Sequence, residues 1–179
     1  VPDHINISPS RIVSGDIVIL SGDIGRHGMC ILSKREGLEF ESEIRSDSAP
    51  LNQIVKSLIE AEVEIHCMRD LTRGGLGSAV VEIAEASSMH FSLNSNSIPV
   101  KADVQAACEL LGIDPIFVAN EGRFILIVPE TEKDKVLDVI NKYEMCDGST
   151  VIGIVKDHNS GMVTIQNEFG IISLPEHIW

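Results

Sequence analysis

Two short runs in this chain are apolar at every position, and they constrain the fold more than any other feature. The runs are Ile17–Leu20, which lies between Gly15 and Gly22, and Phe124–Val128. A short, uninterrupted apolar run between turn-forming residues is typical of a buried strand. We therefore predict two buried strands, with Phe124–Val128 in the middle of a sheet.

Helical patterns separate these runs. Apolar residues recur every three or four positions over 51–59, which predicts an amphipathic helix with Ser48 as its N-cap and Pro50 in its first turn. Shorter alternating or apolar runs predict strands at 63–68 and 91–93. The helical spacing also predicts further helices at about 27–37, 75–87, 104–112 and 136–143.

The C-terminal part of the chain has the spacing of strands rather than helices. Strands are predicted at 151–155, 162–165 and 171–174, joined as a meander by turns at Asn159–Gly161 and Asn167–Gly170. We therefore predict an α+β fold, with helices layered on a mixed or antiparallel sheet.

The length of 179 residues suits one domain. We expect that domain to occupy residues 13–179. The polar residues 1–12 are expected to be a linker or arm from an upstream part of a longer chain.

Composition excludes several classes of function. The formal net charge of −13 opposes binding to nucleic acid, for which a basic patch is usual. No apolar run reaches the ~20 residues that a membrane-spanning helix needs, so a membrane partner is not expected.

Cysteines and histidines show no metal-binding spacing. The four cysteines contain no CxxC pair and are predicted to be buried, reduced thiols of a cytoplasmic protein. The six histidines form no HxxxH or HExxH motif, so no metal site is expected. His66 is predicted to lie on the polar face of a half-buried strand, where a catalytic role is not favoured.

The polar segment Arg69–Gly77 lies between a predicted strand and a predicted helix. Its glycines let the backbone approach a ligand closely, and a helix N-terminus offers free N–H groups to an anion. Asp70 or Thr72 is suited to capping this helix, Asp70 to holding a metal ion, and Arg73 to pairing with phosphate or carboxylate. The alternative is an ordinary tight connection that Thr72 caps.

Two further polar segments border the apolar runs. Asn120–Arg123 directly precedes the second run, and a carboxylate such as Glu121 at a strand mouth is a usual general base or ligand-orienting group. The alternative is a β-turn with a solvated glutamate. Ser21–Gly28 follows the first run as a glycine-rich turn that either binds an anion or only reverses the chain.

Several short strings spread over residues 9–174 match one known superfamily in the right order. They are Gly15–Gly22, Ile24–Gly28, Ser46–Leu51, Arg69–Leu76, Ile98–Val100, Cys108–Gly112 and Ala119–Arg123. On these strings, the chain resembles the C-terminal domain of the aminoimidazole-ribonucleotide synthetase superfamily. Within that superfamily it is most similar to the HypE family of hydrogenase expression/formation proteins.

The resemblance implies an activity for a longer protein. Family members join an N-terminal ATP-binding domain, which forms a homodimer, to a domain like this one. They accept a carbamoyl group on a C-terminal cysteine and use ATP and Mg²⁺ to dehydrate the thiocarbamate to a thiocyanate. That group becomes a cyanide ligand of the iron in [NiFe] hydrogenase. The implied partners are a carbamoyltransferase and iron-scaffold maturation proteins.

The resemblance also implies roles for individual residues. Glu121 is expected to be the base that takes the amide N–H proton, or the group that positions the amide. Asn120 is expected to orient the substrate. The cleft that faces the nucleotide is expected to contain Asp70, Thr72, Arg73, Gly74 and Gly75, with His27 at its rim.

The chain departs from the family pattern at both ends. Without the ATP-binding domain, residues 1–179 are expected to be inactive alone and to bind no nucleotide firmly. The family ends in Pro-Arg-Ile-Cys, whereas this sequence ends in Pro175–Trp179 and has no terminal cysteine. Two alternatives remain open: a purine cyclo-ligase, selenophosphate synthetase or thiamine-phosphate kinase type of enzyme, or a non-catalytic assembly module.

Overall fold

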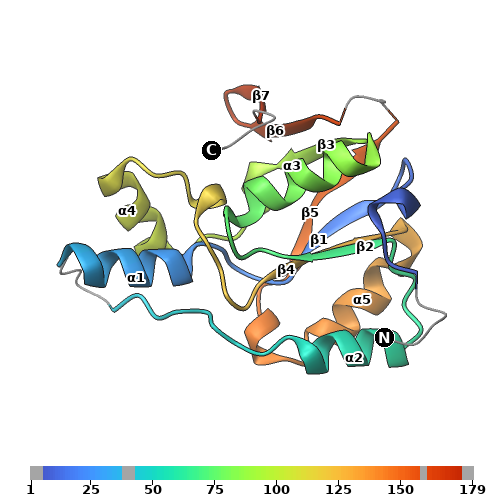
Figure 1. The fold of residues 1–179 in the computed structure, drawn as a ribbon, viewed down its shortest axis with the longest axis horizontal. Coiled ribbons are helices and arrows are strands. Elements are labelled where there is room, and N and C mark those ends of the chain that lie inside the picture. Colours follow the sequence, from blue (N-terminus) through green and yellow to red (C-terminus); the bar gives the residue numbers. More distant parts are fainter. Residues whose placement is uncertain (1–5, 38–42, 158–160, 175–179) are drawn as a thin grey trace.

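A seven-stranded sheet forms the centre of the protein, with strand order β2-β4-β1-β5-β3-β6-β7 (Figure 1). The computed structural model describes residues 6–37, 43–157 and 161–174. Among these strands, β3 and β6 run parallel, and every other neighbouring pair is antiparallel. The strands are β1 Ile17–Leu20, β2 Cys67–Asp70, β3 His90–Asn94, β4 Phe124–Val128, β5 Thr150–Lys156, β6 Val163–Asn167 and β7 Gly170–Ser173.

Helices cover the two faces of this sheet unequally (Figure 1). The helices are α1 Arg26–Glu36, α2 Asn52–Glu60, α3 Gly75–Ser87, α4 Ala102–Leu111 and α5 Lys133–Ile140. One face packs against α3, and the opposite face packs against α2 and α5. α1 and α4 contact each other beside the sheet. The predicted α+β fold, with helices layered on a mixed sheet, is confirmed.

The two apolar runs form interior strands, as predicted. β4 pairs with β2 on one side and β1 on the other, and β1 pairs with β4 and β5. Ile125 and Ile127 of β4 face α3, whereas Phe124 and Leu126 face α2 and α5. Because both faces are covered, neither alternate set of side chains is polar.

The start of α2 differs from the prediction. The helix begins at Asn52, its N-cap is Leu51, and the cap makes no side-chain hydrogen bond. Ser48 is therefore not the N-cap, and Pro50 precedes the helix instead of lying in its first turn. Ser48 lies in a segment without regular structure, whose residue Ala49 donates its N–H to the Glu121 carbonyl at 3.4 Å. That tertiary contact holds Ser48 away from the helix.

The predicted strand at 63–68 is wrong in its position, because β2 begins only at Cys67. β2 is an edge strand, so it tolerates the exposed residues Arg69 and Asp70. The apolar residues that suggested an earlier start for this strand lie instead in the connection between α2 and β2. The Val63 N–H closes that connection by donating to the Leu58 carbonyl at 3.1 Å.

His66 is buried, not on a polar face. It is 7% exposed, and its Nδ1 lies 2.7 Å from Oδ2 of Asp16. The carbonyl of His66 accepts the Ser8 N–H at 2.9 Å, and Arg11 donates to the Ile65 carbonyl. Residues 6–12 are therefore fastened to the edge of the domain.

The predicted meander is wrong for its first pair of strands. β3 lies between β5 and β6, antiparallel to the first and parallel to the second. Phe91 and Leu93 are buried, so β3 is an interior strand that hydrogen-bonds on both sides. Only β6 and β7 form the expected hairpin. Residues 159 and 160 of the predicted turn, and the tail 175–179, lie outside the described residues.

Candidate functional site

The nominated polar segments meet at one end of the sheet. The registers Leu20↔Ile125 and Asp70↔Phe124 bring the ends of β1 and β2 beside the beginning of β4. Leu71 then donates its N–H to the Arg123 carbonyl at 3.0 Å and accepts the Asn120 N–H at 3.0 Å. Antiparallel pairing thus brings together three loops that are far apart in the sequence.

Asn120 ties these loops together from the inside. It is fully buried, and its Oδ1 accepts the Gly25 N–H at 2.8 Å. Its Nδ2 donates to the carbonyls of Leu71 and Val118, each at 3.1 Å. An amide has two N–H donors, and both are used within the protein. This geometry makes Asn120 a structural hub and leaves it no N–H for a substrate.

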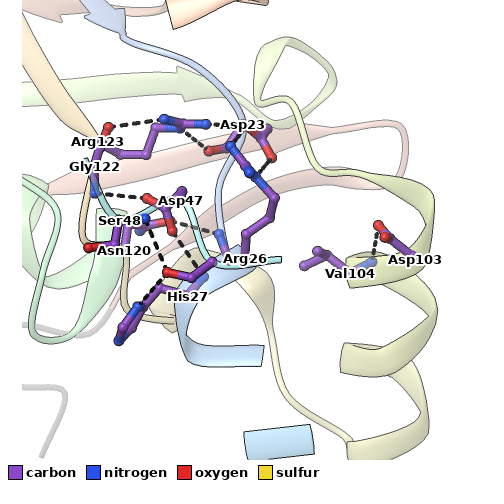
Figure 2. Close-up of polar contacts among 12 residues, drawn as sticks. Asp23, Arg26, His27, Asp47, Ser48, Asp103, Val104, Asn120, Gly122 and Arg123 are labelled. Atoms are coloured by element: carbon purple, nitrogen blue, oxygen red, sulfur yellow. Dashed lines mark hydrogen bonds and ion pairs between the residues drawn. The ribbon is translucent and has the colours of Figure 1, made fainter. Parts of the chain in front are cut away.

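Asp47 is the second hub, and sequence reasoning did not nominate it. Its Oδ1 accepts the His27 N–H at 3.0 Å, and its Oδ2 accepts those of Glu121 at 3.2 Å and Gly122 at 2.9 Å. Figure 2 shows this carboxylate between α1 and the loop before β4. The available signal was the string Ser46–Leu51, which contains Asp47 and is one of the strings that carry the family resemblance.

Glu121 is anchored through its backbone but open at its side chain. Its N–H and carbonyl are held by Asp47 and Ala49. The residue is exposed, and among the described residues no hydrogen bond or ion pair engages its carboxylate. A fixed backbone with an unused carboxylate is the arrangement that a general base requires.

His27 lies on the other side of the same junction. It is half-buried in the first turn of α1, and its Nδ1 is 2.9 Å from Oγ of Ser46. A largely apolar cavity of about 420 Å³ begins at His27 and extends past Phe117, Val118 and Ala119. His27 therefore borders a cavity whose lining residue Ala119 is two positions before Glu121 in the sequence.

An ionic cluster lies next to the junction (Figure 2). Asp23 binds Arg26 at 2.6 Å and Arg123 at 2.5 Å, and Arg123 is only 2% exposed. Burial alone would raise the pKa of the Asp23 carboxyl. Hydrogen bonds and charge from Arg26 and Arg123 outweigh that effect, so the pKa is lowered from 3.8. The buried Arg123 guanidinium is thus paired, and it also donates to the Asp23 and Gly122 carbonyls.

The loop before α3 does not cap its helix as predicted. Thr72 Oγ1 donates to Asp70 Oδ1 at 2.9 Å, so neither side chain reaches the helix N-terminus. The N-cap is Gly74, with a φ of 75° and no side-chain hydrogen bond. Both capping predictions are therefore wrong, because the two side chains satisfy each other in a local turn. Arg73 is exposed beside them.

Gly75 allows another segment to approach its backbone closely, but that segment belongs to the protein itself. Its φ is 62°, and a Cβ at this position would lie 2.7 Å from the Ile116 carbonyl oxygen and 2.6 Å from that of Val118. The loop 115–118 therefore packs directly on the start of α3. Among the described residues, no group of three or more His, Cys, Asp or Glu side chains is placed to hold a metal ion.

The family model for the AIR synthase related protein, C-terminal domain, matches residues 13–166. The chain belongs to this family. The AIR synthase related domain here is 42% identical over 170 residues to the hydrogenase expression/formation protein HupE of Azotobacter chroococcum mcd 1. It is 41% identical over 170 residues to carbamoyl dehydratase HypE of Azotobacter vinelandii. Each alignment covers 95% of this chain but only 50% of the relative.

Solved structures give the same relationship. The AIR synthase related domain superposes on a hydrogenase maturation protein HypE in complex with ATP at a TM-score of 0.91 and 35% identity. It superposes on a HypE–HypF complex at a TM-score of 0.87 and 38% identity. These alignments cover 97% and 95% of this chain, and 54% and 56% of the solved chains. A thiamine monophosphate kinase structure from Aquifex aeolicus, at 17% identity and a TM-score of 0.58, shares the fold alone.

Proposed function

We propose that this chain is the C-terminal part of a carbamoyl dehydratase of [NiFe]-hydrogenase maturation. Residues 13–179 would form its C-terminal domain, and residues 1–12 the arm that leads from an ATP-binding domain. The chain spans about half the length of the relatives it matches, and those relatives include proteins named carbamoyl dehydratase HypE. Superposition on a HypE structure with ATP supports the same assignment.

The proposed reaction removes the elements of water from a thiocarbamate. ATP transfers its terminal phosphoryl group to the amide oxygen with release of ADP, which converts that oxygen into a leaving group. Loss of the two N–H protons and departure of the phosphate then leave a carbon–nitrogen triple bond on the sulfur. A base beside the amide nitrogen accelerates this step because the protons must leave as the triple bond forms.

Glu121 is the proposed base, and its geometry is the observation that carries the proposal. Its carboxylate is exposed at the point where the ends of β1 and β2 meet the beginning of β4, while its backbone is fixed by Asp47 and Ala49. Asn120 acts from within by holding the loop, which replaces the direct substrate contact expected from the sequence.

Nucleotide binding is proposed to be shared with the upstream ATP-binding domain. Asp70, Thr72 and Arg73 present polar groups at the same end of the sheet, beside the backbone of Gly74 and Gly75. His27 would lie at the rim of the nucleotide-binding cleft that these residues would line. Mg²⁺ would be held mainly by the phosphates and the upstream ATP-binding domain, and the chain without that domain would be inactive.

The proposed partners, oligomeric state and cellular location are based on the relatives. A solved HypE–HypF complex supports a partner of the carbamoyltransferase type, and an iron-scaffold protein would receive the product. A homodimer formed by the upstream domain and a cytoplasmic location complete the proposal. None of the helices in the described part of the chain is long and apolar enough to cross a membrane.

The decisive experiment replaces Glu121 in the full-length protein that carries this domain. Glu121→Gln is expected to lower ATP-dependent thiocyanate formation about 10²–10⁴-fold while leaving the fold intact. Glu60→Gln serves as the matched control, because Glu60 is an exposed residue of α2 that lies far from Glu121 in the sequence. A Glu121→Gln protein with full activity would remove Glu121 as the base. Activity absent even from the unaltered protein would favour the non-catalytic assembly module.

A further inference from the structure

The carboxylate of Asp47 has an unusual set of partners. All three hydrogen bonds that it accepts come from backbone N–H groups, those of His27, Glu121 and Gly122. It is 5% exposed, and among the described residues no arginine, lysine or histidine side chain forms an ion pair with it. A buried carboxylate is costly unless hydrogen-bonded, so these amides are what stabilise its charge.

Two of these amides belong to the segment that presents Glu121. The segments containing Asp47 and Glu121 also bond in the reverse direction, because Ala49 donates to the Glu121 carbonyl at 3.4 Å. Gly122 completes the contact, since a Cβ there would collide with the Asp47 carbonyl oxygen. We call this arrangement of residues 47–49 against 121–122 the clasp. It fixes the backbone on both sides of the Glu121 Cα.

The third amide belongs to the N-terminus of α1. The His27 N–H lies in the first helical turn, whose own N-cap Gly25 makes no side-chain hydrogen bond. Asp47 therefore caps α1 from a distant part of the sequence, with its negative charge at the positive end of the helix dipole. The same carboxylate thus relates the position of His27 to that of Glu121.

We propose that Asp47 is a positioning residue, which sets the orientation of the Glu121 carboxylate by holding the Glu121 and Gly122 amides against the N-terminus of α1. This inference rests on the proposed function for its catalytic meaning. Asp47 itself is buried, and this role needs no contact with substrate. Its effect on rate would pass entirely through Glu121.

The test combines two substitutions in the full-length protein. Asp47→Asn retains the shape but gives one side of the group an NH₂ that faces backbone N–H donors. Displacement of Glu121 by about 1 Å is expected to lower kcat about 10- to 100-fold with little change in KM. In a Glu121→Gln background, Asp47→Asn is expected to have no further effect on kcat.

Asp16→Asn is the matched control. Asp16 is also buried, at 1% exposure, and it accepts hydrogen bonds from His66 and the Val13 N–H. It differs in position, because it lies just before β1, whereas the candidate site lies after the other end of that strand. Its effect on kcat is expected to be the same in both backgrounds, as for independent sites. If Asp47→Asn behaved like this control, with equal losses in both backgrounds, the positioning role would be refuted.

Hydrogen exchange separates this inference from the proposed function. Asp47→Asn is expected to raise amide exchange in a peptide covering 119–124, and Asp16→Asn is not. Unchanged exchange there would refute the clasp whatever the kinetics showed. Raised exchange together with full activity of Glu121→Gln would leave the clasp standing and refute the base, and with it the catalytic meaning of Asp47.

Discussion

Arg123 and Asp23, one hundred positions apart, form a buried ion pair in which Nη2 of the arginine lies 2.5 Å from Oδ1 of the aspartate. Nε of the same guanidinium donates to the Asp23 carbonyl at 2.7 Å. The pair joins the turn after β1 to the first residues before β4. Removing one partner leaves the other buried without a counter-charge, which is far costlier than losing an exposed pair.

Asp23→Asn is therefore expected to lower the free energy of unfolding by about 3–5 kcal/mol at pH 7. The folded-state pKa of Asp23 is lowered, so the carboxylate stabilises the protein above its unfolded pKa of about 3.9. This stabilisation is lost as the pH falls through the lower folded pKa. Urea unfolding from pH 7 down to pH 2 should show the difference in stability between the two proteins shrinking below about pH 3.9. Asp138→Asn, an exposed change, is expected to alter stability at neither pH.

Gly75 and Gly112 both have a positive φ, but only Gly75 is closely packed, so alanine substitutions at the two positions can be compared. Gly75→Ala adds the strain of a positive φ and a collision with the carbonyls of Ile116 and Val118. Gly112→Ala adds the strain alone, since its φ is 66° and nothing lies within 4 Å of the added Cβ. We expect Gly75→Ala to be the more destabilising by about 1–3 kcal/mol. Equal losses in thermal or urea unfolding would show that residues 115–118 do not pack there.

Asn120→Ala is expected to destabilise the protein without any ligand present. The change leaves the Gly25 N–H and the Val118 carbonyl short of a partner in a buried site, at a cost of about 2–3 kcal/mol. Asn94→Ala is the control, because Asn94 is exposed and accepts only a local N–H from Asn96. Equilibrium urea unfolding measures both. A loss for Asn120→Ala no larger than that of the control would contradict the assignment of Asn120 as a hub.

The thiols are expected to be unreactive in the native protein. All four cysteines are free and buried, as predicted from their sequence context. Burial raises the pKa of Cys108 and of Cys146 to about 11, so only ~10⁻³ of either is thiolate at pH 8. Labelling with a thiol-specific disulfide reagent should be slow until urea unfolds the chain, when all four react. Rapid native labelling of Cys108 or Cys146 would contradict this burial.

Local patterns predicted the elements that depend on burial. The runs Ile17–Leu20 and Phe124–Val128 and the helix Gly75–Ser87 are observed where the spacing placed them, since each has its own apolar signature. β2 was misplaced because an edge strand imposes no apolar pattern on Arg69 and Asp70. The position of β3 between β5 and β6 depends on non-local pairing, which short-range patterns do not record.

The candidate site was predictable only in part. Glycines and charged residues at strand ends correctly indicated three loops, and the structure shows that these loops meet. Which side chain faces inward was not predictable, because Asn120 and Asp47 are polar residues buried by partners far away in the sequence. The hydrogen bonds of Asp47 span 20 to 75 positions, beyond the reach of any motif.

The position of β1 between β4 and β5 has a consequence for synthesis of the protein. Ile17–Leu20 has no strand to pair with until the ribosome has added residues 124–128 and then 150–156. At ~5–20 residues per second, the wait for β4 alone is roughly 5–20 s. Throughout that time a strand that is apolar on both faces is exposed on the nascent chain. We expect it to be the segment that chaperones hold, and chains truncated before Lys156 to aggregate through it.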